Sequence, residues 1–91
     1  MVEYLVPILP PHGPLSLFVN SNVTETVQGE PVHARVTGLH DEDTLRITSR
    51  YNGKWVQALM MQWARKNRMQ PLPVLKVIAR DTIGAEFHDN Q

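Results

Sequence analysis

The sequence predicts an α+β fold, namely a mostly antiparallel sheet of about four or five strands with one amphipathic helix packed on one face. Short segments with a period of two recur between polar turns, whereas only one segment has a helical pattern of apolar residues. The 91 residues suffice for one small domain, because short chains bury a small core. We place this single domain at 15–88, between a proline-rich N-terminal arm (1–14) and a polar tail (89–91).

The N-terminal arm carries four of the seven prolines of the chain, with apolar residues between and before them. Proline fixes φ and lacks an amide donor, so we expect residues 1–14 to be extended but not to form a central strand. We expect the arm to pack on the edge of the domain or on a neighbouring subunit.

Two short strands are predicted next. Leu15–Val19 is an apolar run that ends at a polar Asn-Ser-Asn sequence, and Val23–Val27 ends at Gln28-Gly29. Polar and glycine residues of this kind terminate strands, so these segments are the first and second predicted strands.

A β-hairpin is the clearest strand pattern. Apolar and polar residues alternate in Val32–Thr37 and again in Leu45–Tyr51, and the polar segment Gly38–Asp43 connects them.

The hairpin register predicts a positively charged face. If Thr37 pairs with Thr44, Arg35 lies opposite Arg46 on the side away from the core. Like charges directly opposite each other destabilise a strand pair, so this face requires an anion. An acidic side chain, the turn Asp41–Asp43 or a ligand would each provide one.

The segment Lys54–Arg68 predicts the single helix, after a turn at Asn52-Gly53. A stripe at helical spacing, expected to face the core, consists of Val56, Leu59, Met60 and Trp63. Further apolar residues widen this stripe, so the helix is either central in the fold or covered by another chain. We expect the second arrangement, a homo-oligomer with an interface at Trp55, Met61 and Trp63.

The C-terminal part predicts a proline-bounded link at Met69–Pro73 and a strand at Val74–Arg80. A turn at Asp81–Gly84 and a last short strand at Ala85–His88 are expected to follow.

Acidic and basic residues are separated along the chain although the formal net charge is zero. The segment from Thr44 to Arg80 holds eight basic residues and no acidic residue. With one cation of the preceding strand they form the candidate anion-binding or partner-binding set: Arg35, Arg46, Arg50, Lys54, Arg65, Lys66, Arg68, Lys76 and Arg80.

Three interpretations of these cations remain open. Asp41–Asp43, Glu25 and Glu30 can fold back and neutralise them, an acidic protein can bind them, or nucleic acid can bind them. The predicted face lacks the aromatic residues on which single-strand binders stack bases, which weighs against nucleic acid.

No catalytic constellation is evident. The chain has no cysteine, no nucleophile elbow, no glycine-rich phosphate loop and no helical zinc motif. His40 with Asp41 and Asp43 could hold a cation, but a solvated acidic turn is the expectation, and no metal or cofactor is predicted. Val32–Gly38 resembles the first-strand motif of acylphosphatases, but the acidic loop that follows would repel phosphate.

These observations predict a small, non-catalytic interaction or regulatory protein. It would dock on another macromolecule, another protein or itself, through a basic face and an apolar helix. The alternative is a nucleic-acid-binding regulator that uses the arginine-rich central segment. The N-terminus does not resemble a signal peptide and no apolar run could span a bilayer, so we expect a soluble, cytoplasmic protein without a membrane partner.

Overall fold

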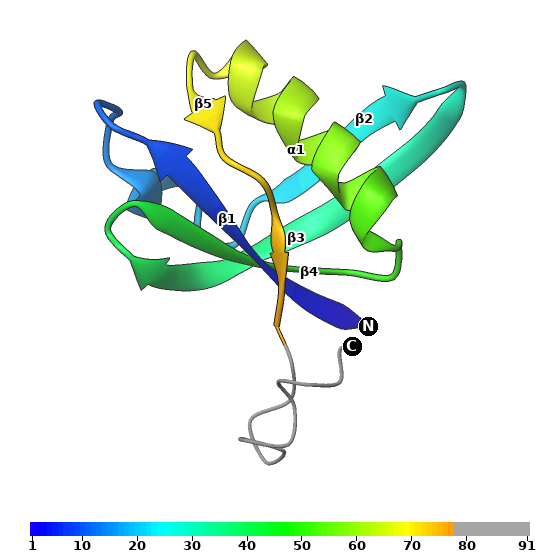
Figure 1. Cartoon of the computed structure of the whole chain (residues 1–91), viewed down its shortest axis with the longest axis horizontal. Coiled ribbons are helices and arrows are strands. Elements are labelled where there is room, and N and C mark those ends of the chain that lie inside the picture. The colour runs from blue at the N-terminus through cyan, green and yellow to red at the C-terminus, as the bar shows by residue number, and fades with distance from the viewer. Residues whose placement is uncertain (78–91) are drawn as a thin grey trace.

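The computed structural model describes residues 1–77 of the chain, which form a curled antiparallel sheet with one helix across it (Figure 1). The fold prediction is therefore confirmed. The elements in chain order are β1 (Val2–Leu9), the 3₁₀ helix η1 (Leu15–Phe18), β2 (Asn22–Val27), β3 (Glu30–Asp41), β4 (Thr44–Ser49), α1 (Gly53–Lys66), β5 (Gln70–Pro71) and β6 (Leu75–Lys76). The strand order is β2-β3-β4-β1-β5, and β6 also pairs with β1.

The N-terminal strand β1 lies inside the sheet, so the prediction of an arm that cannot be a central strand is wrong for Val2–Leu9. This strand pairs with β4 on one side and with β5 and β6 on the other. Pro7 is tolerated because its carbonyl accepts from the Leu72 amide (2.8 Å), whereas the Ile8 amide donates to Asp43 of the hairpin (2.8 Å). The nitrogen of Pro7, which has no hydrogen to donate, therefore points toward β5 and β6. The neighbouring strand is interrupted between these two elements, so no strand hydrogen bond is lost there.

The apolar segment predicted as the first strand, Leu15–Val19, is instead the helical turn η1 (Leu15–Phe18). Its leucines do not share one environment, because Leu15 is buried whereas Leu17 is 73% exposed. Strand pairing begins just after it, where the Val36 amide donates to the Ser21 carbonyl (2.9 Å). The prediction of a second strand at Val23–Val27 is confirmed by β2.

The hairpin of β3 and β4 is confirmed, but its predicted register is wrong by two residues. Val36 pairs with Ile47, and Arg35 lies opposite Thr48 rather than Arg46. Two irregularities, between Val36 and Gly38 and between Leu39 and Asp41, each insert one extra residue into β3. A shift of two residues keeps every side chain on its predicted face, because the strand period is two.

Helix α1 begins after Asn52, whose side-chain oxygen accepts from the amides of Lys54 (3.1 Å) and Trp55 (3.2 Å). An asparagine in extended conformation that accepts these two bonds is a favourable N-cap. The helix is also held on both sides. Gln62 donates to the Thr26 carbonyl of β2 (3.1 Å), and Gln57 accepts from the Val74 amide (2.7 Å).

Much of the apolar surface of α1 is covered within one chain, because residues 55–64 are all buried or half-buried. Trp55, Ala58 and Trp63 pack against the core, and the ring of Trp63 meets that of Phe18 edge to face at 5.0 Å. Trp55, Met61 and Trp63 nevertheless each keep some exposed surface. An oligomer with its interface at these three residues stays a prediction.

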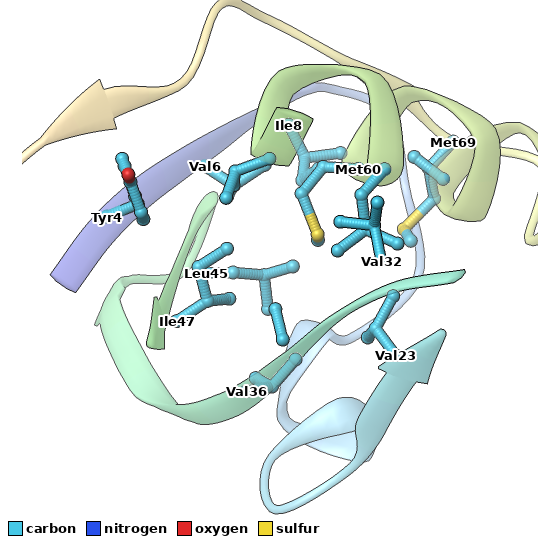
Figure 2. Close-up of a cluster of buried hydrophobic side chains, with 14 of the residues drawn as sticks. Tyr4, Val6, Ile8, Val23, Val32, Val36, Leu45, Ile47, Met60 and Met69 are labelled. Carbon is cyan, nitrogen blue, oxygen red and sulfur yellow. The ribbon is translucent and has the colours of Figure 1, made fainter. Parts of the chain in front are cut away.

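The core lies between α1 and the concave face of the sheet, with contributions from every strand of the β1–β4 part (Figure 2). Val6, Ile47 and Leu59 have no exposed surface. Tyr4 is also buried, and its hydroxyl donates to the Tyr51 carbonyl (2.8 Å), so its polar atom has a partner. Burial raises the pKa of Tyr4.

The C-terminal predictions are tested only as far as Val77. The link at Met69–Pro73 contains the short strand β5, and the strand predicted at Val74–Arg80 appears as β6 within this part. The predicted turn at Asp81–Gly84 and strand at Ala85–His88 lie outside the described residues. Within residues 1–77, no helix is both long and apolar enough to cross a membrane.

A candidate anion-binding face on the sheet

The face of β2, β3 and β4 that is turned away from α1 carries one carboxylate, that of Asp41, which pairs with Thr44 at the hairpin end. We call this surface the outer face. Strand register and alternation place the following residues on it: Asn22, Thr24, Thr26, Pro31, His33, Arg35, Thr37, Gly38, Asp41, Thr44, Arg46 and Thr48. Away from the hairpin end its charged side chains are arginines, with one histidine beside them.

Three arginines gather on this face or at its end. Arg35 is exposed on β3, directly opposite Thr48 of β4. Arg46 lies two residues before Thr48, and Arg50 follows two residues after it, just beyond the end of β4. At the usual rise of a strand, Arg46 and Thr48 are about 7 Å apart, and Arg35 lies beside Thr48. The register thus places Arg35 and Arg46 on one face, with Arg50 in the bend that follows β4, and anion binding at this face stays a prediction.

The acids proposed as internal counter-ions point elsewhere. Glu25 lies opposite buried Val32 on the helix side of the sheet, and its carboxylate binds Lys66 at 2.6 Å. Glu30 lies opposite buried Val27 on the same side. The interpretation that these two glutamates neutralise the outer face is therefore wrong, because both lie on the side of the sheet that faces α1.

One carboxylate from the neighbouring strand does reach the arginines. Glu3 of β1 accepts from Arg46 at 2.9 Å, and both side chains are about one-third exposed. Among residues 1–77, neither Arg35 nor Arg50 has a carboxylate within ion-pair distance. The outer face therefore keeps a positive charge that Glu3 only partly offsets.

The acidic turn of the β3–β4 hairpin binds a histidine rather than the arginines. His12 Nε2 lies 2.7 Å from an Asp43 carboxylate oxygen, and its Nδ1 lies 2.6 Å from the Gly13 carbonyl. Both ring nitrogens face acceptors, an arrangement that suits the doubly protonated ring. These hydrogen bonds, to Gly13 first and Asp43 second, raise the pKa of His12.

The pair of His12 and Asp43 could not be predicted from the sequence, because 31 residues separate them. Within the same turn, Asp41 accepts from the Asp43 amide at 2.9 Å. This hydrogen bond to the charged form lowers the pKa of Asp41. His40, Asp41 and Asp43 do not come together as a cation site, and residues 1–77 contain no cluster of three metal-binding side chains.

The remaining predicted cations do not join the outer face. Lys54 is at the start of α1, whereas Arg65, Lys66 and Arg68 are at or after its end. Lys76 does not share the outer face, contrary to the prediction. It pairs with Tyr4, a core residue, and therefore lies on the side of the sheet that faces α1. Arg80 lies outside the described residues.

An aromatic pair lies at the end of the outer face, contrary to the expectation that aromatic residues are missing there. The ring of exposed His33 meets that of Tyr51 edge to face at 5.5 Å, with an interplanar angle of 85°. The Tyr51 hydroxyl donates to the Pro31 carbonyl (3.0 Å), which holds the ring against the start of β3. Sequence alternation placed Tyr51 with the core residues, against which it does pack, but gave no sign of its contact with His33.

Two hollows lie away from the outer face. One, of about 490 Å³, is lined by Glu30, Val32, Tyr51 and Trp55. The other, of about 300 Å³, is lined by Met61, Arg65, Met69, Gln70 and Pro71. Neither brings together a nucleophile with a base, so the outer face is the candidate site. Comparison of the chain with models of protein families, with curated proteins and with solved structures found no match to any of them.

Proposed function

We propose that this protein is a non-catalytic binding protein that docks on an acidic macromolecule through its outer face. The observation that carries the proposal is the charge of this face, where Arg35 and Arg46 are neighbours, Arg50 follows the end of β4, and the carboxylate that β2–β4 contribute, Asp41, lies at the hairpin end. Arginine is well suited to this role, because its guanidinium is always charged and binds carboxylate or phosphate through two parallel hydrogen bonds.

The outer face supports this function better than the helix does. Residues 55–64 of α1 are at least partly covered within the chain, so little apolar helix surface remains for a partner. The cations at the two ends of α1 are separated by most of the helix, and Lys66 already has Glu25 as its counter-ion. Cations within a Debye length of one another, about 8–10 Å, act on a partner together, and the diagonal neighbours Arg35 and Arg46, about 7–8 Å apart, meet this condition.

A pair of matched triple variants tests the proposal. Arg35, Arg46 and Arg50 are replaced by glutamine in one variant, and Lys54, Arg65 and Arg68 in the other, so both lose the same formal charge. Binding of the full chain to immobilised polyglutamate and to single-stranded RNA is measured at about 50 mM salt, where phosphate contacts are strong. We expect the first variant to lose binding to the acidic polymer and the second to retain most of it.

Equal losses in both variants would show that net charge, rather than the outer face, is responsible. A wild-type chain that binds neither polymer would contradict the proposal outright. Urea unfolding of both variants is the control for structure. The first variant loses one partly exposed ion pair, which contributes at most about 1 kcal/mol, so its fold should persist.

A further inference from the structure

We infer that the acidic macromolecule is a single-stranded nucleic acid, an inference that rests on the function proposed above. The outer face of β2–β4 would carry the sugar–phosphate backbone, and the ring pair of His33 and Tyr51 would contact a base.

The composition of the outer face favours nucleic acid over an acidic protein. Protein interfaces have a core of buried aromatic or aliphatic anchors and few charges at their centre. The outer-face residues of β2–β4 include no large aliphatic side chain, and apart from Pro31 and Gly38 they are polar or charged. On the neighbouring strand β1, Leu5 lies directly opposite Arg46. Interfaces with nucleic acid are more polar and more positively charged, and threonine and asparagine side chains commonly contact phosphate and sugar.

The ring pair adds a feature that a protein carboxylate does not need. In an edge-to-face pair, one ring points its edge at the face of the other ring. The ring that points its edge therefore has neither of its faces covered by its partner ring. His33 is exposed, and Arg35 lies two residues further along the same side of β3. A base stacked at His33 and Tyr51 would therefore have a guanidinium within reach of its phosphate.

A single strand fits this surface better than a duplex. Many readers of duplex DNA insert a helix into the major groove. Here α1 is held between Thr26 and Val74 by Gln62 and Gln57, and its residues 55–64 are covered. The available surface is the outer face of the β-sheet, which carries polar side chains. The sugar–phosphate backbone of a single-stranded nucleic acid can bind along it while one of the unpaired bases contacts the aromatic rings.

The test measures fluorescence anisotropy of a labelled mixed-sequence RNA of about twelve nucleotides, within the site sizes of single-strand binders, against increasing salt. Because Glu3 holds Arg46, two phosphate contacts, by Arg35 and Arg50, predict that log K falls with log salt with a slope of about −1.4 for a single strand. Arg35→Gln and Arg50→Gln should each reduce the slope by about 0.7. His33→Ala should weaken binding on the order of ten-fold and leave the slope unchanged, because stacking releases no counter-ions.

Three controls make the result decisive. Tyr51→Phe retains the ring and should retain binding, whereas His40→Ala, an exposed histidine of the hairpin turn, should have no effect. The duplex form of the same sequence should bind more weakly than the single strand. Stronger binding of the duplex, or an unchanged affinity of His33→Ala, would overturn the inference. Binding to polyglutamate without binding to RNA would overturn it while preserving the proposed docking function, and binding to neither would overturn both.

Discussion

Arg46 of β4 and Glu3 of β1 form an ion pair of 2.9 Å at the boundary of the outer face. Their strands are neighbours, and Leu5 rather than Glu3 lies directly opposite Arg46, so the pair is diagonal. This contact makes the three arginines unequal, because Arg46 alone has a counter-ion among the described residues.

Removing the carboxylate of this pair should strengthen binding to polyanions. Glu3→Gln frees Arg46 by removing the acid that is paired with it, so the salt slope for a single strand should steepen by about 0.7. The unfolding free energy should change by less than about 1 kcal/mol, because the pair is partly exposed. Glu42→Gln, which removes an equal charge from the hairpin turn, is the matched control in the same titration. Equal effects of the two variants would indicate long-range charge rather than release of Arg46.

The contact of His12 with Asp43 predicts a pH-dependent contribution to stability. The pKa of folded His12 lies above its unfolded value, so this contribution is fully present below about pH 6.5 and is lost as pH rises through the folded value. Urea unfolding of wild type and His12→Gln should therefore differ more at about pH 5.5 than at about pH 8.5. His40→Gln, also beside acidic residues but exposed, should show a much smaller pH dependence. A difference between wild type and His12→Gln that is constant with pH would argue against the protonated ring.

The N-cap of α1 predicts a moderate loss of stability in Asn52→Ala. Two helix amides lose their acceptor, which costs about 1 kcal/mol in comparable helices. Chemical denaturation measures the loss, and Asn52→Asp should restore most of it because aspartate caps equally well. If both substitutions cost the same, the lost stability does not come from the cap.

Trp63 provides a test of the coverage of α1. Because its ring packs on Phe18 within the chain, Trp63→Ala should destabilise the fold, on the order of 2–3 kcal/mol for a partly exposed tryptophan. Leu17→Ala, at an apolar residue that is 73% exposed in the same region, should change stability by less than about 0.5 kcal/mol. Sedimentation should show one mass for the wild type and both variants. A folded Trp63→Ala whose mass is half that of the wild type would support the subunit interface expected from the sequence.

The sequence predicted those elements whose pattern is local. Period-two alternation identified the β3–β4 hairpin, and the apolar stripe with Asn52 before it identified α1. Errors arose where distant segments decide the outcome. Pro7 argued against a central strand, but the gap between β5 and β6 leaves a place in the sheet where its missing amide donor is tolerated. The register of the hairpin could not be predicted, because nothing in the sequence marks the two extra residues of β3.

The same limit applies to the candidate site. Arg35 and Arg46 lie on one face as expected, because a register shift of two preserves the face of each, whereas Arg50 follows the end of β4 and the binding role of all three stays a prediction. The pairs of Glu3 with Arg46 and of His12 with Asp43 join residues 43 and 31 positions apart, so charge counting along the chain could not assign them. Tyr51 reaches the outer face through a hydrogen bond to Pro31, a contact that alternation along one strand cannot predict.

The position of β1 has a consequence for how this molecule is made. This strand precedes both of its flanking partners in the chain, which are Thr44–Ser49 and the short strands that end at Lys76. The nascent chain must therefore keep the apolar segment Val2–Leu9 unpaired until these partners have been synthesised. Such long sequence separations slow folding, so a newly emerging β1 is the segment that a chaperone would have most reason to hold.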